Sequence, residues 1–357
     1  MTMQHITSSG YNIYFNDDCY SYLQELLVPG SYSNVFIIAD ENTSQHCLPN
    51  FLAQLATELP IEIIEFDAGE INKTIETCIQ VWHALTEMGA DRKSLIINVG
   101  GGVVTDLGGF AASTFKRGMD FINVPTSLLA MVDASVGGKT GVDLGVLKNQ
   151  IGVINNPVAV LIDTQYLETL PAAEMRSGLA EMLKHGLIED ENYWKQFKDL
   201  TGLTTDDLGA LIYRSVQIKN EVVMQDPTEK GLRKILNFGH TLGHAIESYF
   251  LESADKTTLL HGEAIAIGMI LEAHISVAQN LLPESEYLEI KGVIHSIFPK
   301  VDFTPEDIDN VIGLLIHDKK NEAGKVQFVM LERTGHAVIN KEAGNHLIFN
   351  AFSDYQN

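Results

Sequence analysis

An apolar run that ends in three consecutive glycines constrains the fold of this 357-residue chain more than any other feature. Residues 95–99 read LIINV, and the chain continues through Gly100, Gly101 and Gly102 into the helix-like segment VVTDLGGF. A buried strand that passes through glycine directly into a helix is typical of α/β proteins. We therefore expect a parallel sheet around this segment.

The same alternation of strand, turn and helix extends on both sides of the glycines. The other apolar runs are VFIIA at 35–39, IEIIEF at 61–66, FINVP at 121–125 and VAVLID at 158–163, with a helix predicted at about 74–88. Continuous apolar runs of this length predict parallel strands that are buried on both faces. The pattern predicts a doubly wound, Rossmann-like α/β domain over residues 1–169.

From Pro171 onward the sequence becomes almost entirely helical in pattern. Examples are LAEMLKHGLI, the run 206–224 and the run 264–281, each with apolar residues at helical spacing. We predict a second, all-α domain over residues 170–357. Two domains also suit the chain length.

The glycines at 100–102 suggest what the first domain binds. Glycine lets the backbone approach a pyrophosphate, whose charge is stabilised by the amides and dipole of a helix N-terminus. The spacing differs from GxGxxG, so a purely structural turn is the alternative. Either Asp40 or Asp106 is suited to hold the ribose. We predict a dinucleotide site at the carboxyl ends of the strands.

A segment rich in glycine and lysine follows the strand at 121–125. Loops on a rigid scaffold commonly carry binding groups. The net charge of −23 makes the few basic residues here informative, since they suit a small anion, although solvated surface lysines are the alternative. The same charge argues against nucleic acid or an anionic membrane as a partner. The candidate binding residues are Thr126, Ser127, Asp133, Lys139, Lys148 and Asn149.

Three histidines stand out in the second domain. His240 and His244 are four residues apart in an apolar helical pattern, so they project from one helix face, and His261 precedes another helix. Three imidazoles can bind zinc and leave a coordination position open for substrate. The alternative is that they only satisfy local hydrogen bonds. Thr241 replaces the glutamate of HExxH, which argues against hydrolysis by that route.

The segment LAEMLKHG offers a carboxylate to the same ion. Glu181 and Lys184 are three residues apart on one helical face, and Glu181 can complete zinc coordination with two histidines. His185 is a rival ligand, with a polar position beside the ligands as its other role.

The cysteines and the hydropathy pattern indicate in which cellular compartment the protein is expected. Cys19, Cys47 and Cys78 are odd in number and suggest reduced thiols in a cytoplasmic protein. We see no apolar run after a basic start and therefore expect no signal peptide. We also expect no membrane span, because the best candidate, 264–282, contains Glu272 and has helical periodicity.

Taken together, the motifs resemble those of the 3-dehydroquinate synthase family, within the sugar-phosphate cyclases. The match runs from Asp40 to the DKK at 318–320. Its most specific parts are GGGVVTDLGGF, VPTSLLAMVDASVGGKTGV, LKNQIG, LPAAEMRSGLAEMLKHG, GLRKILNFGHTLGHAIE and LHGEAIAIGM. The resemblance implies a Rossmann-like NAD domain followed by a helical metal-binding domain, and a homodimer.

The resemblance also implies roles for individual residues. The metal ligands fall on Glu181, His240 and His261, with zinc or cobalt as the ion. Catalytic positions are Glu229, His244, Lys184 and Lys219. Substrate contacts are Arg117 (reaching across a dimer interface), Asp133, Lys139, Lys148, Asn149, Arg233, Asn237 and Lys319 or its neighbour Lys320. NAD contacts are Asp40, Asn42, Glu70, Lys73, Gly101, Gly102, Val103, Asp106, Thr126, Ser127, Tyr166, Leu167, Glu168 and Thr169.

The sequence departs from the family pattern in two places. Thr105 stands where glycine is common, and VDLGVLKN differs from the usual segment before the Lys148–Asn149 pair.

The implied reaction is a carbon–oxygen lyase step of the shikimate pathway. It converts 3-deoxy-D-arabino-heptulosonate 7-phosphate to 3-dehydroquinate and phosphate, with NAD used catalytically. One alternative is another sugar-phosphate cyclase, although such relatives usually vary at Lys184, Arg233 and Asn237. The second is a metal-dependent polyol dehydrogenase of the glycerol dehydrogenase type, which would release NADH in stoichiometric amounts.

Overall fold

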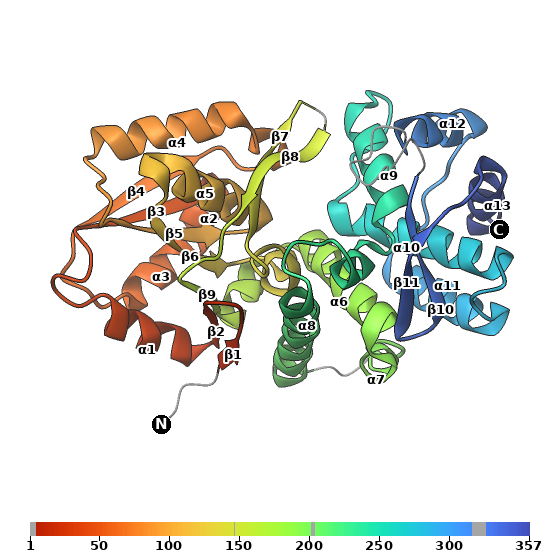
Figure 1. Ribbon diagram of the computed structural model, residues 1–357, viewed down its shortest axis with the longest axis horizontal. Helices are drawn as coiled ribbons and strands as arrows, with labels where there is room; N and C mark the ends of the chain where they lie inside the picture. The colour runs from red at the N-terminus through yellow and green to blue at the C-terminus, as the bar shows by residue number, and fades with distance from the viewer. Residues whose placement is uncertain (1–4, 146, 201–203, 316–325) are drawn as a thin grey trace. The chain divides into compact units, whose positions relative to one another are not determined.

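The computed structural model describes residues 5–145, 147–200, 204–315 and 326–357. The chain divides into two compact units, Met1–Met175 (unit 1) and Arg176–Asn357 (unit 2). An α/β unit with a parallel sheet followed by a helical unit confirms the predicted fold class (Figure 1). The domain boundary after residue 169 stays a prediction, because helix α6 (Ala172–Glu189) runs through the division between the units.

Unit 1 is built on a seven-stranded sheet with the order β1-β2-β9-β6-β5-β3-β4. All neighbouring strands are parallel except β1 and β2. Every residue of β3 and β5 is buried, which is why these strands read as continuous apolar runs. The strands are β1 His5–Thr7, β2 Asn12–Phe15, β3 Val35–Asp40, β4 Ile61–Phe66, β5 Leu95–Gly100, β6 Asp120–Pro125 and β9 Ala159–Ile162.

Helix α5 packs very closely on the sheet. A Cβ added at Gly108 would lie 2.0 Å from Asn98 Oδ1 of β5, and one at Gly109 would lie 2.5 Å from Thr140 Cγ2. Only glycine permits this separation. The helical segments of unit 1 are α1 Asp17–Leu26, α2 Glu41–His46, α3 Leu48–Gln54, η1 Glu70–Asn72, α4 Ile75–Glu87, α5 Gly102–Thr114, η2 Phe115–Arg117, η3 Ala130–Ala134 and η4 Thr164–Thr169.

The glycine- and lysine-rich segment is more regular than its composition suggested. It forms an antiparallel hairpin of β7 (Lys139–Leu144) and β8 (Leu147–Ile154). A Cβ on Gly141 would lie 2.5 Å from the Ile151 carbonyl oxygen, and one on Gly152 would lie 2.4 Å from the Thr140 carbonyl oxygen, each on the opposite strand. The glycines therefore allow close pairing of the two strands, and the expected loop is corrected to a hairpin.

Unit 2 is organised around helix α10 (His261–Ala278). This helix is buried along most of its length and packs against α9, α11, α13 and β10. A helix that is apolar on all sides is expected at the centre of a domain. The other helical segments are α7 Glu191–Lys195, α8 Thr205–Gln225, η5 Leu232–Asn237, α9 His240–Glu252, α11 Glu284–Ile297, α12 Pro305–Leu314 and α13 Asn345–Tyr355.

One element of unit 2 is not helical. Strands β10 (Phe328–Arg333) and β11 (His336–Lys341) form an antiparallel hairpin whose turn contains Gly335 at φ 79°. The prediction of an all-α domain missed this pair. Among the described helices of both units, none is long and apolar enough to cross a membrane.

Candidate functional site

The three histidines of unit 2 form one cluster. His240 is the first residue of α9, His244 follows one turn later, and His261 is the first residue of α10. The ring centroids are 5.1 Å apart for His240 and His244, 5.5 Å for His240 and His261, and 5.7 Å for His244 and His261. One ring nitrogen from each lies within 4.8 Å of the others, which is a spacing that can hold a metal ion.

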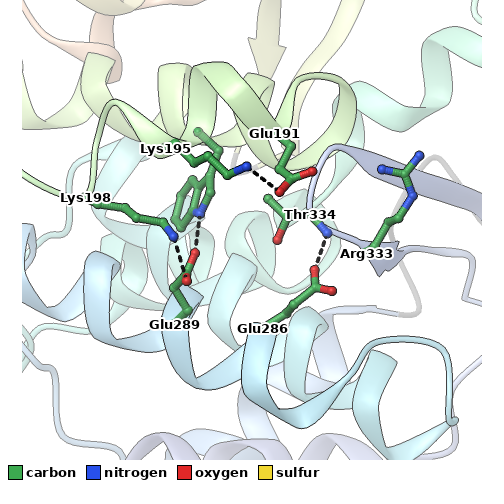
Figure 2. Close-up of a pocket in the computed structure, with 8 residues that line it drawn as sticks. Glu191, Lys195, Lys198, Glu286, Glu289, Arg333 and Thr334 are labelled. Carbon is green, nitrogen blue, oxygen red and sulfur yellow. Dashed lines mark hydrogen bonds and ion pairs between the residues drawn. The ribbon is translucent and has the colours of Figure 1, made fainter.

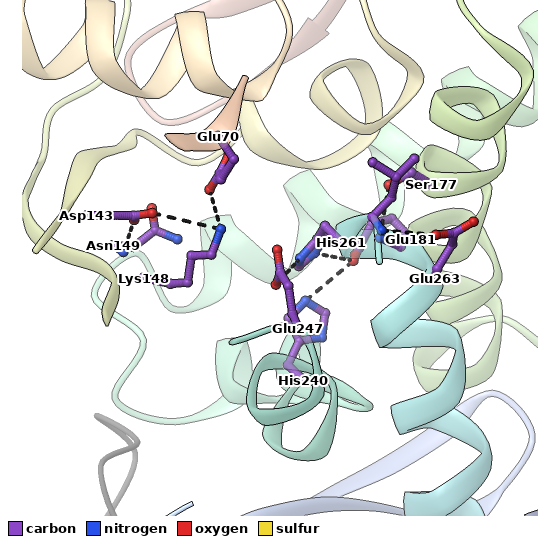
Figure 3. Close-up of polar contacts among 12 residues, drawn as sticks. Glu70, Asp143, Lys148, Asn149, Ser177, Glu181, His240, Glu247, His261 and Glu263 are labelled. Carbon is purple, nitrogen blue, oxygen red and sulfur yellow. Dashed lines mark hydrogen bonds and ion pairs between the residues drawn. The ribbon is translucent and has the colours of Figure 1, made fainter. Parts of the chain in front are cut away.

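Glu181 of α6 completes the cluster from a fully buried position. Its Oε1 lies 3.4 Å from His240 Nε2 and 3.5 Å from His261 Nε2 (Figure 3). Lys184 forms an ion pair with Oε2. Within the part of the chain that the structure describes, no group other than Lys184 and these two imidazoles is paired with the carboxylate oxygens. A buried carboxylate in this state favours a cation beside it.

The pKa values of these groups follow from burial and charge. Burial alone would raise the pKa of Glu181, but Lys184 and His240 hold it well below its usual range. Burial and the nearby Lys184 lower the pKa of His240 to about 4, so this imidazole stays neutral. Burial acts in the same direction on His261, yet the carboxylates of Glu247 and Glu181 raise its pKa to about 10. A metal ion that binds His261 therefore displaces a proton.

The other ring nitrogen of each proposed ligand is already used. His240 Nδ1 lies 3.0 Å from the Phe238 carbonyl oxygen, and His261 Nδ1 lies 3.2 Å from Glu247 Oε2. Because an acceptor at Nδ1 selects the tautomer with the lone pair on Nε2, both rings present Nε2 to Glu181. Sequence analysis missed Glu247, although its spacing of three from His244 on one helix was a usable signal.

His185 is held by a contact with helix α8. Its Nδ1 lies 2.7 Å from Ser215 Oγ of α8, and the ring is fully buried. A ring nitrogen of His185 still lies within 4.8 Å of a Glu181 oxygen. His185 is thus a buried neighbour of the carboxylate, and both of its predicted roles stay predictions.

Three of the remaining predicted residues of unit 2 are buried cations. Lys184, Lys219 and Arg233 are each at most 5% exposed. Buried cations of this kind suit an anionic ligand. Lys319 and its alternative Lys320 lie outside the described residues.

The loop before α9 is held by its own hydrogen bonds. Arg233 Nη1 donates to the Pro227 carbonyl at 2.8 Å, and Asn237 Nδ2 donates to Glu229 Oε1 at 2.7 Å. The Asp226 carboxylate accepts from the backbone N–H of Arg233 at 3.1 Å. These contacts order the Arg233 side chain before any ligand binds, which lowers the entropic cost of binding.

In unit 1 the predicted cofactor residues meet where β5 and β6 end. Gly100 and Pro125 are neighbours across the sheet, and Thr126 N–H donates to the Gly100 carbonyl at 3.0 Å. Gly101 precedes α5, and a Cβ there would lie 3.3 Å from Ser127 Oγ. This is a glycine-lined approach to a helix N-terminus of the kind that binds phosphate. Gly102 and Val103 begin the same helix.

Thr105 fits this helix although glycine is common there in the family. The side chain is buried, and its hydroxyl donates to the Gly101 and Gly102 carbonyls, at 3.2 Å in each case. The first turn of α5 therefore keeps its shape.

The two candidates for the ribose carboxylate have different partners. Asp40 ends β3 and caps α2, accepting from Thr43 N–H at 2.7 Å. Asp106 forms a 2.6 Å ion pair with Lys73. Burial alone would lower the pKa of Lys73, but Asp106 and Glu70 raise it, so the amine stays charged.

The β7–β8 hairpin links predicted substrate residues to predicted cofactor residues. Lys148 Nζ lies 2.8 Å from Glu70 Oε1, and Lys73 Nζ donates to Asn149 Oδ1 at 2.7 Å (Figure 3). Asp143 joins both sets, because its Oδ1 accepts from Asn149 N–H at 2.6 Å and its N–H donates to the Lys73 carbonyl at 2.9 Å. Burial raises the pKa of Asp143. Sequence analysis noted the unusual segment VDLGVLKN but did not single out Asp143.

Of the other predicted residues of unit 1, Arg117 lies on irregular backbone, and the rest lie in helical segments or in β7. Arg117 is exposed and has φ 73°, next to Lys116 at φ 48°. Non-glycine residues held at positive φ often mark functional positions. Asp133 lies in the short π-helix η3, and Lys139 is the exposed first residue of β7. Asn42 lies in α2, and Tyr166, Leu167, Glu168 and Thr169 form the end of η4.

A separate pocket in unit 2 contains none of the predicted site residues (Figure 2). Its charged side chains pair with each other, with Lys195 2.7 Å from Glu191 and Lys198 2.7 Å from Glu289. Trp194 Nε1 also donates to Glu289 at 3.0 Å. We therefore assign this pocket to surface packing.

Two family models match consecutive parts of the chain, and they meet close to the division between the two units. The N-terminal family model of 3-dehydroquinate synthase matches residues 63–177, and the C-terminal model matches residues 178–321. A 3-dehydroquinate synthase of Parabacteroides distasonis is 40% identical over 345 residues, covering 95% of this chain and 96% of that protein. One from Halalkalibacterium halodurans is 38% identical over 355 residues, covering 96% and 95%.

Solved structures of cyclases share the whole architecture. A 2-deoxy-scyllo-inosose synthase complexed with carbaglucose-6-phosphate, NAD+ and Co2+ is 27% identical, with a TM-score of 0.82 over 99% of this chain and 100% of that one. The 2-epi-5-epi-valiolone synthase ValA of Streptomyces hygroscopicus, with NAD+ and Zn2+ bound, is 26% identical, with a TM-score of 0.84 over 100% and 99%.

More distant structures share the fold alone. A probable glycerol dehydrogenase from Sinorhizobium meliloti is 15% identical, with a TM-score of 0.66 over 98% of this chain and 97% of that one. The family models cover most of the chain, and relatives of the same name match it over nearly its whole length. The chain belongs to the 3-dehydroquinate synthase family.

Proposed function

We propose that this protein catalyses the reaction of its family, converting 3-deoxy-D-arabino-heptulosonate 7-phosphate to 3-dehydroquinate and phosphate. The observation that carries the proposal is the buried Glu181 facing two imidazoles, in a unit that also buries three cations, within a chain 40% identical to a 3-dehydroquinate synthase. The reaction belongs to the shikimate pathway, which supplies chorismate and the aromatic amino acids.

Glu181, His240 and His261 fit a divalent ion. One carboxylate oxygen and two Nε2 atoms converge at 3.4 and 3.5 Å, which are separations suited to atoms that share an ion and too long for strong hydrogen bonds. Three protein ligands leave one position open, as catalytic zinc sites require. A bound Zn2+ or Co2+ supplies Lewis acidity to a substrate hydroxyl. In this proposal His244 faces the substrate instead of the ion.

The residues at the ends of β5 and β6 fit NAD. Gly101, Gly102 and Val103 offer backbone amides at the start of α5, and Thr126 and Ser127 offer hydroxyls beside them. NAD supplies a hydride acceptor that is regenerated within one turnover. We propose Asp40, Asn42, Glu70, Lys73, Asp106 and the segment Tyr166–Thr169 as the other contacts.

The cationic residues would hold the two anionic ends of the substrate. Arg233 is suited to the carboxylate, because its planar fork binds bidentately and the side chain is already ordered. We assign Lys139, Lys148 and Asn149 to phosphate binding, together with Arg117 from a second subunit. Asp133, Asn237 and Lys319 are proposed substrate contacts, and Lys184, Lys219, Glu229 and His244 are proposed to act at the reacting centre.

Two other activities share this architecture. Lys184, Arg233 and Asn237 are all retained, which favours an acidic substrate over the neutral sugar phosphate of another cyclase. The buried cations argue against a polyol dehydrogenase, because a polyol has no anionic group for them to bind.

The test is an assay of the purified chain with the heptulosonate phosphate. We expect 3-dehydroquinate and phosphate in equal amounts, with no net accumulation of NADH by absorbance. Stoichiometric NADH from a polyol, or turnover of a neutral sugar phosphate instead of the acid, would contradict the proposal.

Assembly and compartment complete the proposal. We propose a homodimer, because the exposed and conformationally unusual Arg117 matches a residue that the family places across the subunit interface. We propose the cytoplasm as the compartment. Cys19, Cys47 and Cys78 are all buried and free of disulfides, which suits a reducing environment.

A further inference from the structure

Helix α9 carries a carboxylate that contacts the histidine of the neighbouring helix. Glu247 lies two turns after His240 and is 8% exposed. Its Oε2 is 3.2 Å from Nδ1 of His261, which is the first residue of α10 (Figure 3). Because Nδ1 faces this carboxylate, Nε2 of His261 points to Glu181. Glu247 therefore sets both the rotation and the tautomer of this ring.

Helix α10 carries a carboxylate that contacts the start of α9. Glu272 is completely buried, and its Oε2 accepts from Gly239 N–H at 2.7 Å while its Oε1 accepts from Leu242 N–H at 3.1 Å. The first amides of a helix have no partner within the helix. Helix α9 has no side-chain cap from its own N-cap residue, Gly239. Glu272 thus caps α9 from another helix, directly beside His240.

Close packing leaves the two helices little freedom to slide. A Cβ on Gly268 of α10 would lie 2.0 Å from the Gly239 carbonyl oxygen, and one on Gly243 of α9 would lie 2.7 Å from Ile265 Cδ1. Gly239 itself has φ 76°, a conformation that favours glycine. The backbone positions of His240 and His261 are therefore coupled.

We propose that Glu247 and Glu272 form a reciprocal clamp, in which α9 and α10 each hold in place the histidine that the other carries. Glu247 acts on the His261 ring, and Glu272 acts on the backbone turn that presents His240. Both are positioning residues that do not touch the ion or substrate. The inference rests on the proposed metal-binding role of Glu181, His240 and His261.

The first test measures metal affinity without turnover. Zn2+ is titrated against a chromophoric chelator in wild type, Glu247→Gln, Glu247→Ala and the control Glu252→Gln, which changes the charge of an exposed residue on the same helix. Loss of a carboxylate behind a histidine ligand weakens metal binding about 10- to 100-fold. We expect the loss to be largest for Glu247→Ala and smaller for Glu247→Gln, which keeps an acceptor oxygen. The control should match wild type.

The second test addresses Glu272 and separates positioning from stability. Glu272→Gln keeps one acceptor oxygen but turns an NH2 group toward a backbone amide, so we expect a lower Tm and about 10-fold weaker Zn2+ binding. The matched control is Tyr249→Phe, which removes the 2.6 Å hydrogen bond from Tyr249 on α9 to Asp307. It should lower the Tm while leaving metal affinity unchanged.

A spectroscopic readout completes the design. Saturating Co2+ should give altered d–d absorption in Glu247→Ala, because the ligand geometry changes. Zn2+ affinity within twofold of wild type in Glu247→Ala and Glu272→Gln would overturn the clamp, while the metal site would stand. Equal losses in Tyr249→Phe would overturn it as well. A wild-type chain that binds no ion would instead contradict the proposed function, and the clamp with it.

Discussion

The histidine helices of unit 2 and the β7–β8 hairpin of unit 1 place their polar groups in different ways. In α9 the spacing of His240 and His244 follows from one turn of helix, and α10 brings His261 to the same cluster. In the hairpin, Lys148 and Asn149 are oriented by contacts to Glu70, Lys73 and Asp143, outside their own strand. A helix presents side chains by its own geometry, whereas the hairpin needs partners.

The difference implies different sensitivities to mutation. Loss of His240 or His261 removes a proposed metal ligand outright, while the helix that carried it remains. Loss of a hairpin contact leaves every proposed binding group present but less well oriented. Large losses of activity are therefore expected when a histidine of the cluster is removed, and smaller ones when a contact that orients the hairpin is removed.

The largest effect is expected for His240→Ala. Removing one ligand of three should weaken metal binding by about 100-fold or more, and activity should fall with it. Metal content by elemental analysis and activity are measured on the same sample, with the half-exposed His336→Ala as control. Full metal occupancy in His240→Ala would refute the ligand assignment.

Arg233→Ala tests whether the buried Arg233 recognises the substrate carboxylate. A desolvated bidentate pair contributes about 2 to 3 kcal/mol, or roughly 30- to 150-fold in kcat/KM. Arg233→Lys keeps the charge without the fork and should recover only part of the loss. The comparison is kcat/KM on the natural substrate and on an analogue without the carboxylate. Equal losses on both would show that Arg233 supports the loop instead.

Asp143→Ala probes the hairpin. It leaves the Asn149 N–H without its acceptor, at a residue with φ 51°, and removes a carboxylate 3.9 Å from Lys148. We expect the substitution to cost about 1 to 2 kcal/mol of transition-state stabilisation, which lowers kcat/KM roughly 5- to 30-fold. Asp143→Asn should lose less, because the amide oxygen still accepts.

The control for the hairpin is Leu144→Ala, at a neighbouring position that is 53% exposed. It should leave kcat/KM unchanged. If Asp143→Ala matches this control, the hairpin orients Lys148 and Asn149 without help from the carboxylate, and the contrast with the helices disappears.

The smallest signal comes from complementation between subunits. Arg117→Ala and Lys139→Ala should each be nearly inactive, but a mixed dimer contains one site with neither defect if Arg117 acts across the interface. Free exchange should restore about a quarter of the sites. Absence of recovery, with mixed dimers demonstrated by mass spectrometry, would place Arg117 in its own subunit's site or outside the site.

The sequence by itself determined the parts of the molecule that follow local rules. Apolar runs located β3, β5, β6 and β9, and the glycines after β5 located the start of α5. Helical spacing placed His240 and His244 on one face. These inferences succeed because a strand or helix fixes its own periodicity, whatever surrounds it. The site roles assigned by resemblance stay predictions.

Only the tertiary structure decided which distant groups meet. Gly239 and Glu272 are 33 residues apart, and His261 and Glu247 are 14 apart, so no local pattern joins them. Asp143 contacts Lys73 through a backbone hydrogen bond between segments 70 residues apart, and the β10–β11 hairpin was also not predicted. In each case the stabilising partner becomes a neighbour only after the chain has packed, because burial and hydrogen bonding act through space and not along the sequence.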